Sequence, residues 1–329
     1  MIETFAVEYL VWSVESRMPP YTQHSTLYTK IMRDTWLIAG AFFITYFVWG
    51  STYLANYWAI QTLPVFGMGG ARFLTAGVLL FIIAAFVGKQ EVPTLRQWGN
   101  AGLIGVLFLT MGTGTVVWAQ QWVPTSTTAL IISFEPLLVM LLMWVAFANR
   151  PPAKAFLGAA VSITGMYLLI DQPATLSGEG AWLGIAGILF GMCCWAGGMT
   201  LVPRLDMGNN KFRATAMQML VGGMILLLFS FAVNDWAGFE LGQVSARSAG
   251  AWVFLVLFGA ILAFSAFNFL LSRVSPDKAA TNTYVNPVVA VALGAMLNGE
   301  VVTGRTVVAG VVMLAGVYFI QSAKKVEAG

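Results

Sequence analysis

Charge is what this chain has least of. Only 9% of its 329 residues are Asp, Glu, Lys or Arg, and 58% are hydrophobic, whereas ordinary soluble domains hold about 25% charged residues. Apolar segments of about 20 residues, the length that crosses a bilayer as a helix, recur from Trp36 to the C-terminus. These segments are too continuous for barrel strands, which alternate over roughly ten residues. The composition therefore predicts an all-α polytopic membrane protein.

Other scarcities argue against enzymes and cofactors. The single histidine, His24, lies outside the apolar segments, and the two cysteines, Cys193 and Cys194, are adjacent and form no CxxC. Gly88–Gln90 lacks the hydroxyl residue of a phosphate-binding loop. Glu135 is the single carboxylate deep inside an apolar segment, where a membrane enzyme would need paired acids, a base or a metal set. We therefore predict no enzyme, no cofactor, no metal and, with a net charge of only +3 scattered at segment ends, no nucleic-acid partner.

Ten apolar segments, separated by turn or charge signals, are predicted to be transmembrane helices. Their predicted limits are 36–57, 65–87, 98–118, 125–146, 154–170, 181–203, 212–233, 250–271, 276–298 and 304–322. Residues 1–34 form a predicted N-terminal tail or extension without the basic region and apolar core of a signal peptide. Residues 323–329 form a short C-terminal tail.

The basic residues predict the orientation, because Lys and Arg gather in cytoplasmic loops. With the N-terminus in the cytoplasm, only Arg247 and Arg305 of the 17 Lys and Arg fall in outer loops, and Arg72 lies within a span. All the others fall in cytoplasmic loops or tails, or among the first three residues of a span at its cytoplasmic end. Both termini are therefore predicted to be cytoplasmic.

The chain also repeats internally. A shift of 151 residues places Pro136 on Pro287, and a shift of 146 residues places Trp49 on Trp195. The predicted repeats span residues 35–171 and 181–322, with five helices each. Because five is odd, the second repeat enters the membrane from the opposite side, which is the inverted arrangement of many secondary transporters.

The opening motif Trp49–Tyr53 (WGSTY), the pair Glu135-Pro136 and the pair Asn286-Pro287, set in two five-helix repeats, resemble the EamA-type branch of the drug/metabolite transporter superfamily. The resemblance covers about residues 36–322. It implies ten helices in two inverted bundles, a bacterial-type inner-membrane location and export of small metabolites, with amino-acid exporters, including those for aromatic amino acids, as the nearest relatives. The second half departs from the first, since Asn286 stands where the first has Glu135.

Glu135 and Asn286 are the first candidates for a central cavity. A carboxylate within a span is costly and marks a functional site by default. Thr128, Ile131 and Glu135 share one helix face, and the shift of 151 residues maps the last two to Asn282 and Asn286. Pro136 and Pro287 are predicted hinges. The alternative is that Glu135 bonds a neighbouring helix, protonated or paired with Arg72, and only fixes the packing.

Arg72 and Gln218 occupy corresponding places in the second and seventh spans. Arg72 is predicted to bind a substrate carboxylate or Glu135. The alternative places its side chain at the lipid headgroups. Gln218 would hydrogen-bond a substrate or a neighbouring helix.

Tyr46, Trp49, Tyr53 and Asn56 form one stripe along the first span. Rings with polar groups suit an aromatic or apolar ligand, although aromatic residues near span ends also form interfacial belts. Trp195 and Asn268, deeper in their spans, are further candidates for the lining.

The sequence therefore predicts a secondary transporter that exports amino acids, aromatic or large apolar ones, by alternating access. Two alternatives stay open. One is an exporter of drugs, sugars or other small metabolites, and the other is a channel. The sequence does not fix the coupling ion or the oligomeric state.

Overall fold

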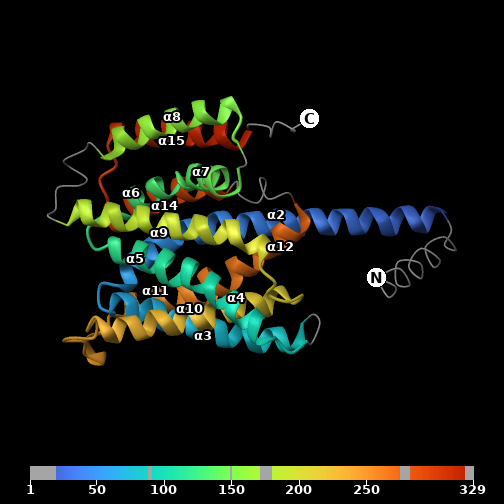
Figure 1. Cartoon of the computed structure of the whole chain (residues 1–329), viewed down its shortest axis with the longest axis horizontal. Helices are drawn as coiled ribbons and strands as arrows, with labels where there is room; N and C mark the ends of the chain where they lie inside the picture. The colour runs from blue at the N-terminus through green and yellow to red at the C-terminus, as the bar shows by residue number, and fades with distance from the viewer. Residues whose placement is uncertain (1–19, 88–90, 149, 171–179, 275–281, 323–329) are drawn as a thin grey trace.

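The computed structural model describes residues 20–87, 91–148, 150–170, 180–274 and 282–322, and the regular structure in these ranges is helical (Figure 1). The predicted C-terminal tail and residues 1–19 lie outside the described residues. The first half contains α2 (Pro20–Ala59), α3 (Val65–Phe86), α4 (Leu95–Gly105), η1 (Val106–Thr113), α5 (Gly114–Ala119), α6 (Thr125–Ile132), α7 (Glu135–Phe147) and α8 (Ala153–Ile170). The second half contains α9 (Ala181–Leu201), η2 (Val202–Arg204), α10 (Lys211–Ala232), η3 (Leu241–Gln243), α11 (Ala246–Phe254), η4 (Leu255–Leu262), α12 (Ala263–Arg273), α14 (Asn282–Asn298) and α15 (Gly304–Ser322).

Seven helical segments of the described chain are long and apolar enough to cross a membrane. They are Thr35–Ala59, Val65–Phe86, Leu95–Ala119, Thr125–Phe147, Ala181–Arg204, Lys211–Ala232 and Ala246–Phe267. The other three predicted spans correspond to shorter apolar helices, Ala153–Leu169, Val285–Asn298 and Gly304–Ile320. The membrane-spanning helical class is thus confirmed, and the count of ten spans stays a prediction.

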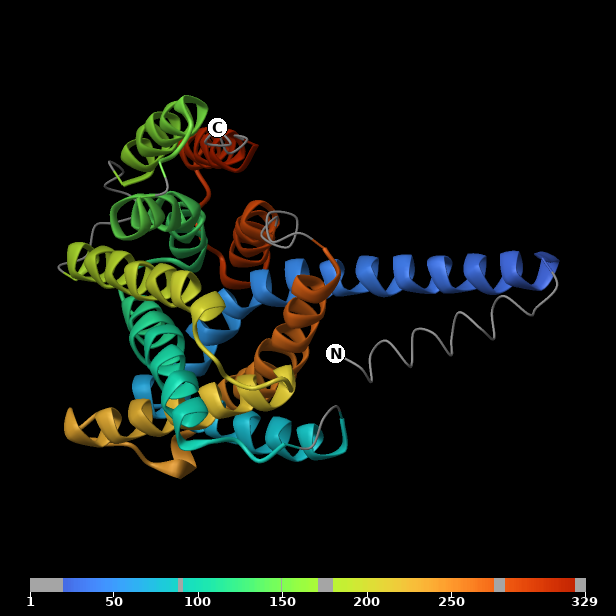
Figure 2. The same ribbon diagram turned by 45° about the vertical axis from the view of Figure 1, so that its right-hand side comes forward.

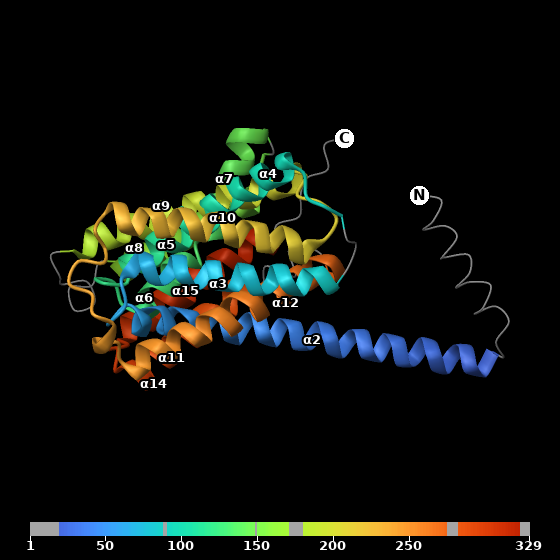
Figure 3. The ribbon, with the colours of Figure 1, turned by 90° about the horizontal axis from the view of Figure 1, so that it is seen from below.

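The first span begins well before its predicted limit. Helix α2 starts at Pro20 and runs without interruption to Ala59, and its N-terminal part extends beyond the rest of the bundle (Figures 1 and 3). No Gly or Pro stands between positions 21 and 39, so nothing in the sequence ends the helix there. Part of the predicted N-terminal tail is therefore helical and continuous with the first span.

Turn residues set the starts of several helices. Pro64 and Pro124 stand immediately before α3 and α6, where a missing N–H costs nothing. Helix α4 begins with a capping box, in which the Gln97 N–H donates to the Thr94 hydroxyl and the Thr94 N–H donates to the Gln97 side chain. Asn210 caps α10.

The helices pack in a regular pattern. Helix α8 lies along α15 at one side of the molecule, and α3 lies along α10 at the opposite side (Figures 1 and 2). Between them, α2 packs against α12 and α14, and α9 packs against η1, α5 and α7. One apolar core cluster joins α5, α6, α7, α8, α9 and α15, and a second joins α3, η1, α10 and η4.

The third and eighth spans are not uniformly α-helical. Each contains one π-helical segment of eight residues, η1 and η4. In η1 the Thr113 hydroxyl donates to the carbonyl of Phe108 at 3.0 Å, five residues earlier. Single π-turns inside α-helices occur frequently at functional sites. Both of these segments contact the first helix of a predicted repeat, η1 with α9 and η4 with α2.

Candidate functional site

The fourth span is broken at the predicted acidic position. Helix α6 ends at Ile132, the chain turns at Ser133 and Phe134, and α7 begins at Glu135 with Pro136 as its second residue. Proline is tolerated in the first turn of a helix and disfavoured further in, so Pro136 favours a new start here. The break places the Glu135 side chain at the N-terminal end of α7.

One oxygen of the Glu135 carboxyl group has an unsatisfied hydrogen-bonding capacity. Its Oε1 atom is buried and has no hydrogen-bond partner among the described residues. The ring of Tyr53 on α2 is within electrostatic range of this carboxyl. Buried polar atoms nearly always have a partner, so the open acceptor marks a place where a ligand or water would bind.

Arg72 is buried within the protein, and the prediction that it binds a substrate carboxylate stays a prediction. Its exposed fraction is 5%, and its Nη1 donates to the Oδ1 atom of buried Asn56 at 3.0 Å. The guanidinium carbon lies 4.8 Å from the centroid of the Phe73 ring. In the described part of the chain its bonded partner is thus Asn56 rather than Glu135, and its Nε atom has no partner there. Arg72 therefore offers a second unsatisfied polar atom, of the opposite charge.

Tyr53 and Asn56 bring these two groups to the same stretch of α2. The two residues are three positions apart in one helix, so they share a face. Tyr53 is within electrostatic range of Glu135, and Asn56 accepts a hydrogen bond from Arg72. The same stretch of α2 is thus near Glu135 at Tyr53 and bonded to Arg72 at Asn56.

Trp49 belongs to the same face but packs against the eighth span. Its Nε1 donates to the carbonyl of Gly259 in η4 at 3.3 Å, and its ring packs on Phe264 and Phe267 at centroid distances of 5.4 and 5.0 Å. Trp195, its counterpart on α9, stacks on Phe108 of η1 at 4.4 Å. Each tryptophan therefore contacts a span that contains a π-helical segment.

Asn286 joins α14 to α2. In the orientation that gives both the oxygen and the nitrogen of its amide suitable partners, the side-chain nitrogen donates to the carbonyl of Tyr46 at 2.9 Å and to that of Asn282 at 3.3 Å. Gly50 allows this approach, because a Cβ atom there would lie 2.6 Å from the Val289 side chain. Unlike Pro136, Pro287 lies inside a continuous helix. The two predicted hinges therefore differ, and only the first coincides with a break.

The structure describes the side chain of Gln218 but not that of Asn268. The Gln218 side-chain nitrogen contacts the sulfur of Met207 at 3.3 Å. Asn268 belongs to α12, but its side chain lies outside the described part of the structure. The assignment of both residues to a substrate site stays a prediction.

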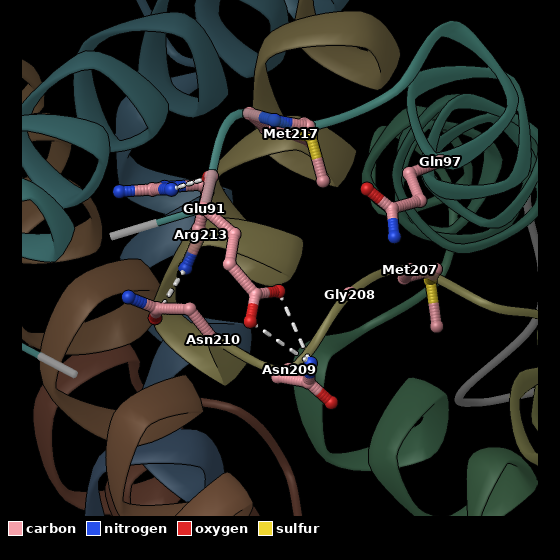
Figure 4. A pocket seen from close by; sticks show the side chains of 9 residues that line it. Glu91, Gln97, Met207, Gly208, Asn209, Asn210, Arg213 and Met217 are labelled. Carbon is pink, nitrogen blue, oxygen red and sulfur yellow. Dashed lines mark hydrogen bonds between the residues drawn. The ribbon is translucent and has the colours of Figure 1, made fainter. Parts of the chain in front are cut away.

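A small polar pocket lies at the end of the bundle where α3 ends and α10 begins (Figure 4). Glu91, Gln97, Asn209 and Arg213 are among its lining residues, and Asn209 Nδ2 donates to the Glu91 carboxylate at 3.1 Å. Its volume of about 10 Å³ has room for one water molecule. We therefore interpret it as a joint between the loops after α3 and η2, not as a substrate site.

Asp206 organises the same loop. It accepts from the Gly208 N–H at 2.9 Å and from Gln97 Nε2 at 3.1 Å, and these two hydrogen bonds lower the pKa of the carboxyl group. Since the pKa is lowered in the folded state, the contribution of this carboxylate to stability is present above its ordinary pKa and is lost as the pH falls through the lowered value.

Two carboxylates that the sequence analysis did not single out cap helices at the opposite end of the bundle. Asp235 accepts from the backbone N–H groups of Val65, Phe66 and Gly67 at the start of α3. Glu300 accepts from Thr125 and Ser126 at the start of α6. The sequence feature that could have indicated this capping role is position, because each carboxylate follows the end of a helix of the second half by no more than three residues.

Comparison with known proteins identifies the family. The model of the EamA-like transporter family matches residues 36–171 and again residues 182–322. The chain belongs to the EamA-like transporter family. The predicted resemblance to this branch of the drug/metabolite transporter superfamily is thereby confirmed.

Relatives of this EamA-like chain agree with that assignment. The "Uncharacterized inner membrane transporter YedA" of Escherichia coli strain K12 is 35% identical over 263 residues, which cover 79% of this chain and 83% of that protein. A "Probable amino-acid metabolite efflux pump" of Salmonella typhimurium is 24% identical over 284 residues, 82% of this chain and 90% of that one. A solved crystal structure shares the fold, with a TM-score of 0.58 and 16% identity over 86% of this chain and 95% of that one.

The EamA-like protein is therefore a multi-pass transporter of the inner membrane, as predicted. Its family and relatives are transporters, which agrees with the prediction that it is not an enzyme.

Proposed function

We propose that this EamA-like protein exports amino acids, aromatic or large apolar ones, from the cytoplasm by alternating access between two inverted five-helix repeats. One relative is named a probable amino-acid metabolite efflux pump, which favours this substrate class. The family match to residues 36–171 and again to 182–322 favours two repeats.

The packing pattern also favours inverted repeats. In the predicted ten-span scheme, α2 contacts the eighth and ninth spans, and α9 contacts the third and fourth. If each span of the first half is replaced by its counterpart in the second half, and the reverse, the contacts of α2 become those of α9. The pairs α3 with α10 and α8 with α15 map onto themselves. Such an exchange is expected of two halves related by an axis in the membrane plane.

The observation that carries the substrate proposal is the pair of unsatisfied atoms on Glu135 and Arg72. A free amino acid presents an ammonium group and a carboxylate. We assign Glu135 to the ammonium group and Arg72 to the carboxylate, because charge-assisted hydrogen bonds are the strong ones. Both groups face one stretch of α2, so a small zwitterion can reach both after the bundle opens.

Aromatic side chains supply the rest of the proposed site. Trp49, with Phe264 and Phe267 beside it, offers an apolar wall for the substrate side chain. Tyr46, Asn282 and Asn286 are assigned to the α2–α14 wall of the path. Trp195, Gln218 and Asn268 are assigned to the lining contributed by the rest of the second half.

Uptake and counterflow of single amino acids in proteoliposomes test this function. We expect Glu135→Gln, Arg72→Ala and Trp49→Ala each to lower transport, the first two by about tenfold or more, since a hydrogen bond to a charged group contributes about 1.5–3 kcal/mol. Glu240→Gln is the matched control, because Glu240 is an exposed carboxylate bonded to Gln243. Unchanged transport in all three site variants would remove the proposed site.

The same assay separates the alternatives. Saturable transport of a drug or sugar, with no amino acid transported, would favour the metabolite exporter. Flux without saturation or counterflow would favour a channel, because a pore does not exchange one bound substrate for another.

A further inference from the structure

We propose that Glu300 is a gate residue, whose carboxylate closes one end of the transport path by holding the fourth and ninth spans together. This inference rests on the alternating-access mechanism proposed above. We call the closed end the Glu300 end; it is formed by the connections that follow α2, α5, α10 and α14, which the basic residues predict to be the outer side.

The contact is built from four hydrogen bonds. Glu300 Oε1 accepts from the N–H and the hydroxyl of Thr125 at 2.9 and 2.6 Å, and Oε2 accepts from the N–H and the hydroxyl of Ser126 at 3.0 and 2.6 Å. These donors form the first turn of α6, where a negative charge also meets the positive end of the helix dipole. One side chain of the second half thus binds two residues of the first half.

The surroundings of the carboxylate are shaped to receive it. A Cβ atom at Gly294 would lie 2.7 Å from Glu300 Oε2, so glycine leaves the space that the carboxylate occupies. The backbone N–H of Glu300 donates to the carbonyl of Gly294 at 3.1 Å, which fixes the turn. Asn298 Nδ2 donates to Oε1 at 3.4 Å, and Asn298 Oδ1 accepts from Trp58 on α2 at 3.3 Å. The contact therefore ties α2, α6 and α14 together.

The fourth span is suited to open at this contact. Helix α6 packs against α14, but after the break at Ser133 the span continues as α7, whose principal contacts are with α9 and α15. The fourth and ninth predicted spans, which contain Pro136 and Pro287, therefore pack on each other mainly through α6, at the Glu300 end. Release of the carboxylate would remove a link between α6 and α14. Helix α6 could then move away from α14 and open the path to Glu135.

Asp235 provides the matched contrast. It caps α3 with the same chemistry, accepting three backbone N–H groups and the hydroxyl of Ser230. Yet α3 and α10 lie along each other over their whole length, and a Cβ atom at Gly70 would lie 2.7 Å from the backbone nitrogen of Leu227. Such backbone packing does not part without unfolding. We therefore assign Asp235 to stability and Glu300 to gating.

Alkylation of a buried position below the contact tests the gate without any substrate. Thr128 is fully buried one turn further along α6. In protein with Cys193→Ala, Cys194→Ala and Thr128→Cys, we measure its reaction with a membrane-impermeant maleimide in spheroplasts. We expect Glu300→Gln to raise the rate by about tenfold, since charge-assisted bonds become neutral ones. Asp235→Asn should leave the rate unchanged while lowering the thermal stability.

An equal alkylation rate with and without Glu300→Gln, or an equal rise with Asp235→Asn, would overturn the assignment. Should Glu300→Gln fail to fold, Ser126→Ala supplies the second test, because it removes the hydroxyl donor to Oε2 and keeps the carboxylate. It should raise the alkylation rate by about fivefold, the effect of losing one hydrogen bond of about 1 kcal/mol. An unchanged rate in this variant would refute the gate. Failure of amino-acid transport with an intact alkylation response would instead refute the proposed substrate.

Discussion

Pro136→Ala is expected to lower transport by about tenfold or more in protein that remains folded. Alanine at position 136 restores a backbone N–H, and it removes the penalty of about 3 kcal/mol that proline imposes on an unbroken helix. Helices α6 and α7 can then join through Ser133 and Phe134. A continuous helix would turn the Glu135 side chain away from Tyr53, because the break sets its present direction.

Pro287→Ala is the matched control for this experiment. Pro287 already lies inside the continuous helix α14, so alanine there adds a backbone hydrogen bond of about 1 kcal/mol without removing a break. We expect higher thermal stability, and transport within about twofold of the unmodified protein, a difference of about 0.4 kcal/mol, since no break is removed. Initial rates in proteoliposomes and unfolding temperatures in detergent measure both effects. Equal losses from the two substitutions would contradict the asymmetry between the prolines.

Gly105→Ala should cause a large loss of stability. Helices α4 and α10 approach so closely there that an added Cβ atom at Gly105 would meet the backbone carbonyl of Gln218. From the other helix, a Cβ atom at Gly222 would lie 2.5 Å from the carbonyl oxygen of Gly105. Backbone atoms cannot move aside as side chains do, so overpacking should cost about 1–3 kcal/mol or more.

Gly99→Ala serves as the control for Gly105→Ala, because it lies in the same helix with no atom within 4 Å of an added Cβ. Alanine there should stabilise the helix by up to about 1 kcal/mol through its higher helix propensity. Thermal unfolding in detergent compares the two variants. The interpretation fails if both lower the unfolding temperature equally or if neither changes it.

The break in the fourth span shows how far the sequence reaches. The local signal Ser133–Pro136 predicts an interruption, since proline disfavours the helix before it. A similar signal at Asn286-Pro287 leads to no break. The difference lies in the neighbours, because the Asn286 side chain donates to the Tyr46 carbonyl and so ties this part of α14 to α2.

The sequence also could not predict the hydrogen-bond partners of the polar residues. Helical spacing places Trp49, Tyr53 and Asn56 on one face of α2, but it does not say which helix that face meets. Arg72 was expected to meet Glu135, a substrate or the headgroups, and it bonds Asn56. The hydrogen bond of Trp49 to Gly259 depends on how η4 crosses α2.

The sequence by itself determined the class of this protein. Scarce charge and long apolar runs require helices in a membrane, because only helices satisfy their own backbone groups over such runs. The motifs Trp49–Tyr53, Glu135-Pro136 and Asn286-Pro287 carried the resemblance to the EamA-type family, which the family match confirms. The tertiary structure alone decided which polar atoms are satisfied and which stay open. Glu300 and Thr125 are 175 positions apart, and their contact depends on helix packing, which no local propensity encodes.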